Sequence, residues 1–338
     1  MSSIPKVSVI MPVYNGGKHL KEAIQSILDQ SFQDFEFIII NDGSTDNSEQ
    51  IILGYNDPRI QYVKNNENLR LIKTLNKGLD LARGEFIARM DQDDIANPER
   101  FTKQVSIFEN NHDVGVCGTW FTLFGDQKER TVIQHPQTND AIKIHLLGYS
   151  TLGHPTVMMR KSAIKNLRYD EQYQAAEDYE FWVRLSTITK MYNIPESLLD
   201  YRMHTTNMTV LEDGTQSKTS DKIRTDQLRR LDIIPVENES EYCELLFTSK
   251  YVKSINELEL KKIIRFANNL EKANNRKKIY ESVLLHNTMN KRLSYLFDKL
   301  ESKSLPLVSF IMVNRPELIR KRGIKYTLAL IVKTFTKR

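Results

Sequence analysis

The sequence predicts an α/β protein whose mixed, mainly parallel sheet is flanked by helices, with a helical appendage toward the C-terminus. Two observations support this fold class. Short apolar runs alternate over residues 7–88 with segments whose apolar side chains recur every three or four positions. Polar or acidic loops then follow three of the runs. Because ligands of open α/β sheets bind beyond the carboxyl ends of the strands, these loops are the expected functional site.

The first elements are expected in the order strand, helix, strand. Residues 7–11 form a β-branched run, which we expect Pro12 to end. The apolar positions of residues 20–28 give the next segment one buried helical face. Residues 35–40 are more continuously apolar, and they predict a second strand that runs into the polar loop 41–48.

A third unit repeats this pattern and ends in an acidic loop. We expect a strand at 60–63, a helix at 71–82 and a strand at 84–88 that leads into residues 91–94, three of which are aspartates. Their charges repel one another, so a fold that gathers them needs a cation. A divalent metal that carries a phosphorylated ligand would supply that charge. A short acidic triplet alone is more often a solvated loop, so this prediction depends on the motifs around it.

Several segments resemble the family 2 glycosyltransferases of the GT-A fold. The resemblance is carried by residues 7–15, 39–46 and 88–101. Further segments stand where that family places its acceptor-side elements, at residues 153–158, 177–182 and 201–204. The resemblance covers roughly residues 5–210 and implies a GT-A nucleotide-binding sheet. It also implies transfer of a sugar from a nucleoside diphosphate to a hydroxyl group.

This resemblance implies a metal site in the acidic loop. Asp93 would bind the metal directly and Asp91 would reach the metal shell or the ribose, whereas Asp94 is either an outer contact or a cap of the next turn. His204 would complete the metal shell, although a lone histidine is more often a surface residue. Oxygen ligands favour Mn²⁺ or Mg²⁺, and an imidazole shifts the preference toward Mn²⁺. Arg202 keeps its charge at any physiological pH and is the expected diphosphate contact.

Nucleotide recognition is expected from the earlier loops. Pro12, Tyr14 and Asn15 would form a turn over the nucleotide, with the Tyr14 ring stacked on the base. The resemblance places a uracil contact at Asp42, which can accept the imide hydrogen of that base. A basic residue near the nucleotide is expected from Arg70 or Lys73; the spacing does not decide between them, and we place Lys73 among the binding residues.

The general base is expected at the start of a helix. Glu177 and Asp178 precede apolar residues at helical spacing, so both carboxylates lie near the positive end of that helix. The resemblance implies that Asp178 is the base and that Glu177 orients the acceptor or the base. The alternative is that both acids serve only the helix dipole. A single displacement would invert the anomeric centre, so that an α-linked donor gives a β-linkage.

Beyond about residue 215 the chain is expected to be helical, because residues 257–270 and 276–300 carry apolar side chains at helical spacing. We therefore expect a catalytic domain over 1–215, an appendage over 216–314 and a basic amphipathic tail over 315–338. That tail has eight Lys or Arg and one acid. It suits an anionic membrane surface, or else it docks onto the catalytic domain.

Composition agrees with a globular enzyme. The chain has 338 residues, a net charge of +5, 40% hydrophobic residues and 27% charged residues, which argues against disorder. The two cysteines, Cys117 and Cys243, lie far apart, which argues against a disulfide framework. Neither a signal-peptide pattern nor a long apolar run is present, so we expect a cytoplasmic protein, peripheral on the inner face of the membrane if the tail binds there.

The expected activity is that of an inverting, metal-dependent glycosyltransferase that uses a UDP-sugar. Its acceptor would be a glycan or a lipid-linked oligosaccharide in the assembly of a bacterial surface polysaccharide, such as capsule or lipopolysaccharide. Nucleic acid is not expected as a partner, since the basic residues are not interleaved with a base-stacking surface.

Three other classes were weighed. A nicotinamide oxidoreductase needs Gly-x-Gly-x-x-Gly after its first strand, and residues 11–17 lack it. A nucleotidyltransferase would share the sheet and the metal-binding acids but would not explain residues 177–178 together with 201–204. A non-catalytic scaffold would tolerate loss of the acids, yet every expected acid is present.

Overall fold

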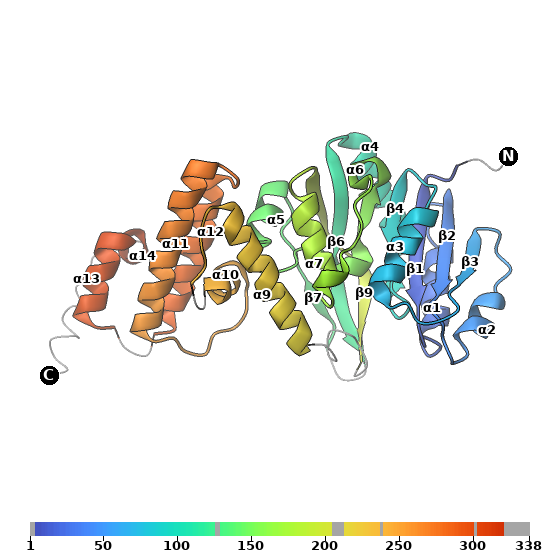
Figure 1. The fold of residues 1–338 in the computed structure, drawn as a ribbon, viewed down its shortest axis with the longest axis horizontal. Helices are drawn as coiled ribbons and strands as arrows, with labels where there is room; N and C mark the ends of the chain where they lie inside the picture. The colour runs from blue at the N-terminus through green and yellow to red at the C-terminus, as the bar shows by residue number, and fades with distance from the viewer. Residues whose placement is uncertain (1–3, 126–128, 205–212, 237–238, 301–302, 321–338) are drawn as a thin grey trace. The chain divides into compact units, whose positions relative to one another are not determined.

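The computed structural model describes residues 4–125, 129–204, 213–236, 239–300 and 303–320 (Figure 1). It divides the chain into two compact units. The first, which we call the sheet unit, contains the described residues up to Ile142 and Ser150–Ser220. The second, the helical unit, contains Lys143–Tyr149 and the described residues from Asp221 onward.

One nine-stranded sheet is built from the described residues of the sheet unit, in the order β3-β2-β1-β4-β8-β6-β9-β5, with β7 paired to β6. The strands are β1 (Val7–Val13), β2 (Phe35–Asn41), β3 (Ile60–Lys64), β4 (Phe86–Arg89), β5 (Ile95–Ala96), β6 (Val114–Gly125), β7 (Thr131–Ile133), β8 (Met158–Arg160) and β9 (Lys190–Met203). The pairs β1–β2, β2–β3, β1–β4 and β6–β9 are parallel, and the remaining pairs are antiparallel. The predicted mixed, mainly parallel sheet is therefore confirmed.

Helices connect the strands and cover the sheet (Figure 1). They are α1 (Leu20–Leu28), α2 (Ser48–Leu53), α3 (Leu71–Leu81), α4 (Arg100–Asn110), α5 (Asn139–His145), α6 (Lys161–Ile164) and α7 (Glu177–Leu185), with short 3₁₀ turns at η1 (His154–Thr156) and η2 (Glu171–Tyr173). Every position of β1, β2 and β4 is buried. This explains why those strands read as continuous apolar runs, since parallel strands are covered on both faces.

The prediction that Pro12 ends the first strand was wrong, because β1 continues to Val13. The oxygen of Ile10 accepts from the Met90 amide and the oxygen of Val13 accepts from the Asp42 amide. The backbone N–H and C=O groups of even-numbered residues in β1 therefore point toward β4, and those of odd-numbered residues point toward β2. The β4 pairing stops at Ile10, so the missing N–H of Pro12 removes no ladder hydrogen bond.

The parallel pairs bring three strand ends to one edge of the sheet. Strand β1 lies between β2 and β4, with Val7 opposite both Phe35 and Phe86. The loops that follow Val13, Asn41 and Arg89 consequently begin side by side. This edge is where the sequence places the functional residues.

The helical unit has its own apolar core, built by the later part of α9 (Asp213–Arg230), α10 (Glu239–Phe247), α11 (Glu257–Lys277), α12 (Ser282–Asp298), α13 (Leu305–Asn314) and α14 (Glu317–Arg320). Arg315, Leu318 and Ile319 are buried in this unit, and Arg315 donates to Glu271 at 2.8 Å. The rest of the expected basic tail, residues 321–338, lies outside the described residues. Among the described helices, none has both the length and the apolar composition needed to cross a bilayer.

Candidate active site

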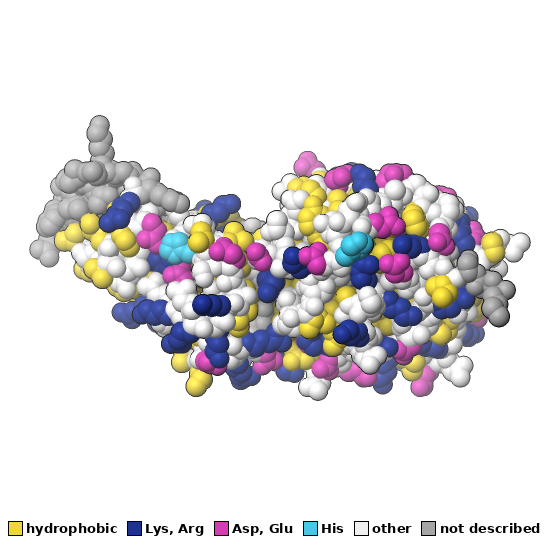
Figure 2. Space-filling view, turned by 90° about the horizontal axis from the view of Figure 1, so that it is seen from above, with side chains coloured by type: hydrophobic (Ala, Val, Ile, Leu, Met, Phe, Trp, Pro, Cys, Tyr) yellow, Lys and Arg dark blue, Asp and Glu magenta, His cyan; other side chains and the backbone are white. Residues whose placement is uncertain are grey.

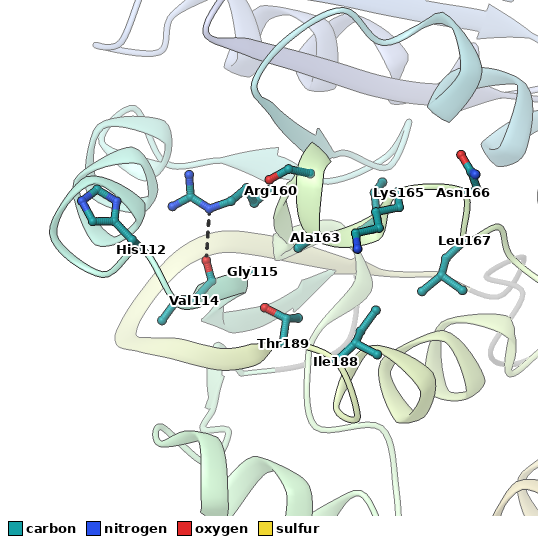
Figure 3. A pocket seen from close by; sticks show the side chains of 12 residues that line it. His112, Val114, Gly115, Arg160, Ala163, Lys165, Asn166, Leu167, Ile188 and Thr189 are labelled. Atoms are coloured by element: carbon teal, nitrogen blue, oxygen red, sulfur yellow. Dashed lines mark hydrogen bonds between the residues drawn. The ribbon is translucent and has the colours of Figure 1, made fainter.

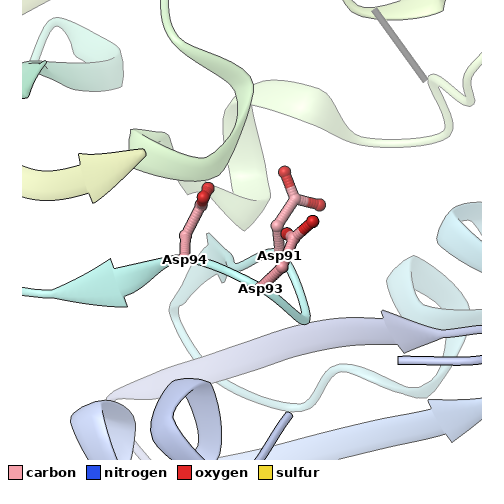
Figure 4. Close-up of side chains that lie close together, drawn as sticks. All are labelled: Asp91, Asp93 and Asp94. Carbon is pink, nitrogen blue, oxygen red and sulfur yellow. The ribbon is translucent and has the colours of Figure 1, made fainter. Parts of the chain in front are cut away.

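The acidic loop lies directly after β4, as expected. Asp91, Asp93 and Asp94 each offer a carboxylate oxygen within 4.8 Å of the others, and the three side chains point to the same side of the loop (Figure 4). Asp94 is 1% exposed, and its Oδ2 has no hydrogen-bond partner among the described residues. A buried carboxylate oxygen that lacks a partner beside two further carboxylates fits a divalent cation.

The end of β9 returns to this loop. Nε2 of His204 lies 2.9 Å from Oδ2 of Asp93, so two of the predicted metal ligands, 111 residues apart, are in contact. The ring of His204 also lies near that of His19, with centroids 5.6 Å apart. Carboxylate oxygens and an imidazole nitrogen form a donor set that suits Mn²⁺ and Mg²⁺.

Arg202 binds the acidic loop through its backbone and its side chain. Its amide donates to Oδ1 of Asp94 at 2.9 Å, and its Nε donates to the backbone oxygen of Asp93 at 2.8 Å. Its guanidinium also forms an ion pair with Glu22 of α1. In this structure, Arg202 therefore fixes the shape of the acidic loop. Asp94, for which a cap was one alternative, instead joins that loop to β9.

Burial raises the pKa of Asp91 and that of Asp94, and the neighbouring aspartate charges raise the pKa of Asp94 further. The charge of Arg89 opposes this effect at Asp91, with which it forms a buried ion pair. Arg89 is itself held at the end of β4, because Arg100 donates to its backbone oxygen at 2.8 Å. Arg100 thus holds the residue from which the acidic loop begins, a role that the sequence did not reveal.

The turn after β1 is attached to the acidic loop by Gln92. The Tyr14 amide donates to Oε1 of Gln92 at 2.9 Å, and Nε2 of Gln92 donates back to the Tyr14 oxygen at 3.2 Å. The Tyr14 side chain remains open, with 45% of the residue exposed. A flat, exposed ring beside the acidic loop is available for stacking.

Asn15 joins the turn after β1 to the loop after β2. Its amide donates to Oγ of Ser44 at 3.0 Å, and its Oδ1 accepts from the Thr45 amide at 2.8 Å. Its φ is +50°, a conformation that asparagine adopts more readily than most residues. The side chain of Asn15 is therefore engaged in positioning the loops.

Asp42 lies at the end of β2 and is 3% exposed. Its Oδ1 accepts from Nδ2 of Asn65 at 2.7 Å and from the Leu69 amide at 2.9 Å. Lys77 donates to Oδ1 of the same Asn65 at 2.6 Å. The predicted cation, Lys73, instead lies 3.6 Å from Glu171 of η2. Lys77 is thus the lysine connected to Asp42, through one intervening amide side chain, and sequence spacing gave no signal for it.

The second carboxylate centre is at the start of α7. Oδ1 of Asp178 accepts from the Tyr179 amide at 2.6 Å, and its Oδ2 accepts from Oγ of Ser150 at 3.2 Å. Burial raises the pKa of Asp178, whereas these two hydrogen bonds and the charge of Arg89 lower it. Glu177, next to it, is buried. The guanidinium of Arg89 therefore acts electrostatically on both Asp91 and Asp178.

A separate cavity of about 630 Å³ lies near the amino end of β6 (Figure 3). Its lining includes Val114, Lys165 and Thr189, and Arg160 donates from Nε to the Val114 oxygen at 3.5 Å. None of the candidate catalytic, nucleotide or metal residues lines it. The candidate active site is instead at the carboxyl edge of the sheet, where the loops after β1, β2 and β4 meet.

Comparison with known proteins agrees with this geometry. Residues 8–168 match the glycosyl transferase family 2. An uncharacterized glycosyltransferase of Haemophilus influenzae is 32% identical over 241 residues, which are 68% of this chain and 75% of the relative. The putative glycosyltransferase EpsE of Bacillus subtilis is 37% identical over 213 residues, which are 60% of this chain and 74% of EpsE. The chain belongs to glycosyltransferase family 2, and it is a glycosyltransferase.

Solved structures show the same fold. Staphylococcus aureus TarS, residues 1–349 in complex with UDP-GlcNAc, has a TM-score of 0.55 and 20% identity, with 85% of this chain and 88% of that chain covered. The mannosyltransferase PcManGT from Pyrobaculum calidifontis, in complex with GDP-Man and Mn²⁺, has a TM-score of 0.50 and 14% identity, with 100% of this chain and 89% of that chain covered. The predicted GT-A class is thus confirmed.

Proposed function

We propose that the protein is an inverting, metal-dependent glycosyltransferase that moves a sugar from a UDP-sugar to a hydroxyl of a glycan or lipid-linked acceptor and forms a β-linkage. The observation that carries this proposal is the contact between Asp93 and His204, beside two further carboxylates and apart from Asp178. The cluster of Asp91, Asp93, Asp94 and His204 suits a cation and a diphosphate. The carboxylate of Asp178 suits the role of proton acceptor.

The donor centre would hold Mn²⁺ or Mg²⁺ through Asp93, Asp91 and His204. A cation bound there would neutralise the charge that develops on the departing diphosphate. Tyr14 would stack on the base, and Asp42 would recognise uracil beside Asn65 and Lys77. The named complexes of TarS with UDP-GlcNAc and of PcManGT with GDP-Man and Mn²⁺ support a nucleotide-sugar donor and a metal in this fold.

The acceptor centre would use Asp178 as general base. Ser150 and the Tyr179 amide hold both oxygens of its carboxylate, which would fix the direction in which it accepts a proton. Glu177 would orient the acceptor or the base. Since proton acceptance and diphosphate departure use different groups, one displacement with inversion is the simplest reaction that uses both.

The test is to incubate the full chain with Mn²⁺ and a panel of nucleotide sugars and to follow the release of free nucleoside diphosphate by slow hydrolysis. The proposal expects release of UDP from one or two UDP-sugars, and loss of that release with EDTA. Asp93→Asn should abolish release, whereas Asp34→Asn, an acid outside the site, serves as the matched control. Release of GDP in place of UDP would contradict the proposed donor class.

A further inference from the structure

One exposed stripe of α11 is strongly basic. Leu258, Lys262, Arg265, Asn269, Lys272 and Arg276 follow one another at alternating steps of four and three residues, which places them on one helix face, and all six are exposed. With a rise of about 1.5 Å per residue, this stripe is roughly 27 Å long. No exposed residue of α11 is acidic.

The cations of this stripe lack ion-pair partners in the part of the chain that the structure describes. Lys262, Arg265, Lys272 and Arg276 form no ion pair with any described residue. Two of the three acids of α11 are engaged elsewhere, since Glu257 accepts from Ser304 and Glu271 accepts from Arg315; the third, Glu259, is half-buried. The stripe therefore presents unbalanced positive charge to its surroundings.

An apolar helix lies beside the stripe. Helix α13 contains no charged residue, and it buries only Leu307, Val308 and Ile311. The ring centroid of Phe310 lies 5.4 Å from the Arg265 guanidinium and 6.0 Å from Nζ of Lys261, which places the ring against the stripe. Val313 is three residues after Phe310, so it lies on nearly the same face, and it is 82% exposed.

We propose that the stripe of α11 and the outer face of α13 together form a docking surface for an anionic lipid bilayer. Phosphate headgroups would pair with the stripe, and Val313 would enter the interface next to them. In the space-filling view, Lys and Arg side chains and apolar side chains lie next to one another on the helical unit (Figure 2).

Charge and apolar exposure together favour a bilayer over other occupants. A soluble polyanion would pair with the cations but would gain nothing from Val313, which is 82% exposed. A second copy would bring two unbalanced basic stripes together, and like charges oppose that contact.

This inference rests on the proposed function only in its link to a lipid-linked acceptor, and the two are separable by experiment. The full chain is floated with vesicles of phosphatidylcholine alone or with about 30% phosphatidylglycerol. Binding is expected to the anionic vesicles and to be at least tenfold weaker to the neutral ones. The double variant Lys262→Glu/Lys272→Glu should bind at least about 30-fold more weakly, since each cation that is removed contributes about fivefold and each added carboxylate is repelled by the surface.

Matched variants separate placement from total charge. Lys165→Glu/Lys291→Glu changes the net charge equally at exposed positions outside the stripe and should bind within about twofold of the unaltered chain. Val313→Asp keeps every cation and should still bind several-fold more weakly. Equal losses for both double variants would overturn the proposal. So would polyphosphate binding as strong as vesicle binding and insensitive to Val313→Asp.

Hydrolysis of the UDP-sugar in vesicle-free buffer is measured on the same proteins. Unchanged hydrolysis in variants that have lost vesicle binding supports a separate docking surface. Hydrolysis without any vesicle binding refutes the surface and leaves the enzyme proposal intact. Vesicle binding without hydrolysis of any nucleotide sugar refutes the enzyme proposal and leaves the surface intact.

Discussion

The loops that follow β1, β2 and β4 differ from the start of α7, which supplies Asp178. These three loops are held together by hydrogen bonds: Gln92 binds the backbone of Tyr14, and Asn15 binds Ser44 and Thr45. Asp178 is instead held by a serine hydroxyl at 3.2 Å and its own helix terminus. In the proposed mechanism, the donor side is therefore held in shape by contacts between its loops, whereas the acceptor side depends on one carboxylate.

The largest effect should come from Asp178→Asn. Transfer is expected to fall about 10²- to 10⁴-fold, the usual contribution of a general base, while affinity for UDP with Mn²⁺ stays within about twofold. The Asp178 pKa is raised on folding, so the folded state holds its proton more tightly and the ionised form opposes folding above the unfolded pKa. The melting temperature of the variant at neutral pH should therefore be equal or higher. Transfer at the normal rate would remove Asp178 from the mechanism.

His204→Ala should weaken Mn²⁺ affinity by about 10- to 100-fold, in the range found when a metal site loses a supporting group. Titration of Mn²⁺ against UDP release measures this. His19→Ala is the matched control, because its ring lies 5.6 Å from His204 yet it is no predicted ligand. Equal metal affinity in the His204 variant and the unaltered protein would place His204 outside the metal shell.

The pH dependence of transfer should show where the base titrates. Because burial raises the Asp178 pKa and only the ionised form accepts a proton, transfer should decline on acidification at a pH above the ordinary aspartate value of about 3.9. A pH series of transfer rates at saturating donor measures the acidic limb. The same limb in Ser150→Ala should move to higher pH, since that hydroxyl lowers the pKa. A shift to lower pH would contradict the assignment.

The smallest effect compares two lysines on α3. Lys77→Met should weaken UDP binding about fivefold, since about 1 kcal/mol is typical of a lost hydrogen bond that orients a binding group. Lys73→Met should change it by less than about twofold, because that side chain lies near Glu171. Isothermal titration with UDP decides between them, and the reverse order would restore the original expectation for Lys73.

Local pattern was sufficient for the four strands β1–β4 and for the edge at which the site lies, whereas the longer strands β6 and β9 were not predicted. Buried parallel strands and amphipathic helices leave periodic signals, so the run at 35–40 and the helix at 20–28 could be recognised from the sequence. The acidic loop could be placed in the same way, because it directly follows the apolar run that forms β4.

What escaped prediction depends on partners far away in the chain. Pro12 can remain in β1 because β4 stops pairing with β1 before that position. Lys77 is connected to Asp42 because Asn65 lies between them and binds both. Glu22 and Arg202 form an ion pair across 180 residues, which no local spacing signals. These contacts are set by the tertiary fold, in which polar side chains find partners after the strands have paired.

The two hydrogen bonds between Gln92 and the backbone of Tyr14 have a thermodynamic consequence. Gln92 stands between Asp91 and Asp93, so any displacement of those carboxylates on cation binding also moves the turn that carries the aromatic ring. A cation and a nucleobase would then each increase the affinity of the other, by the same factor in both directions. Gln92→Ala would uncouple the two equilibria while leaving every proposed ligand in place.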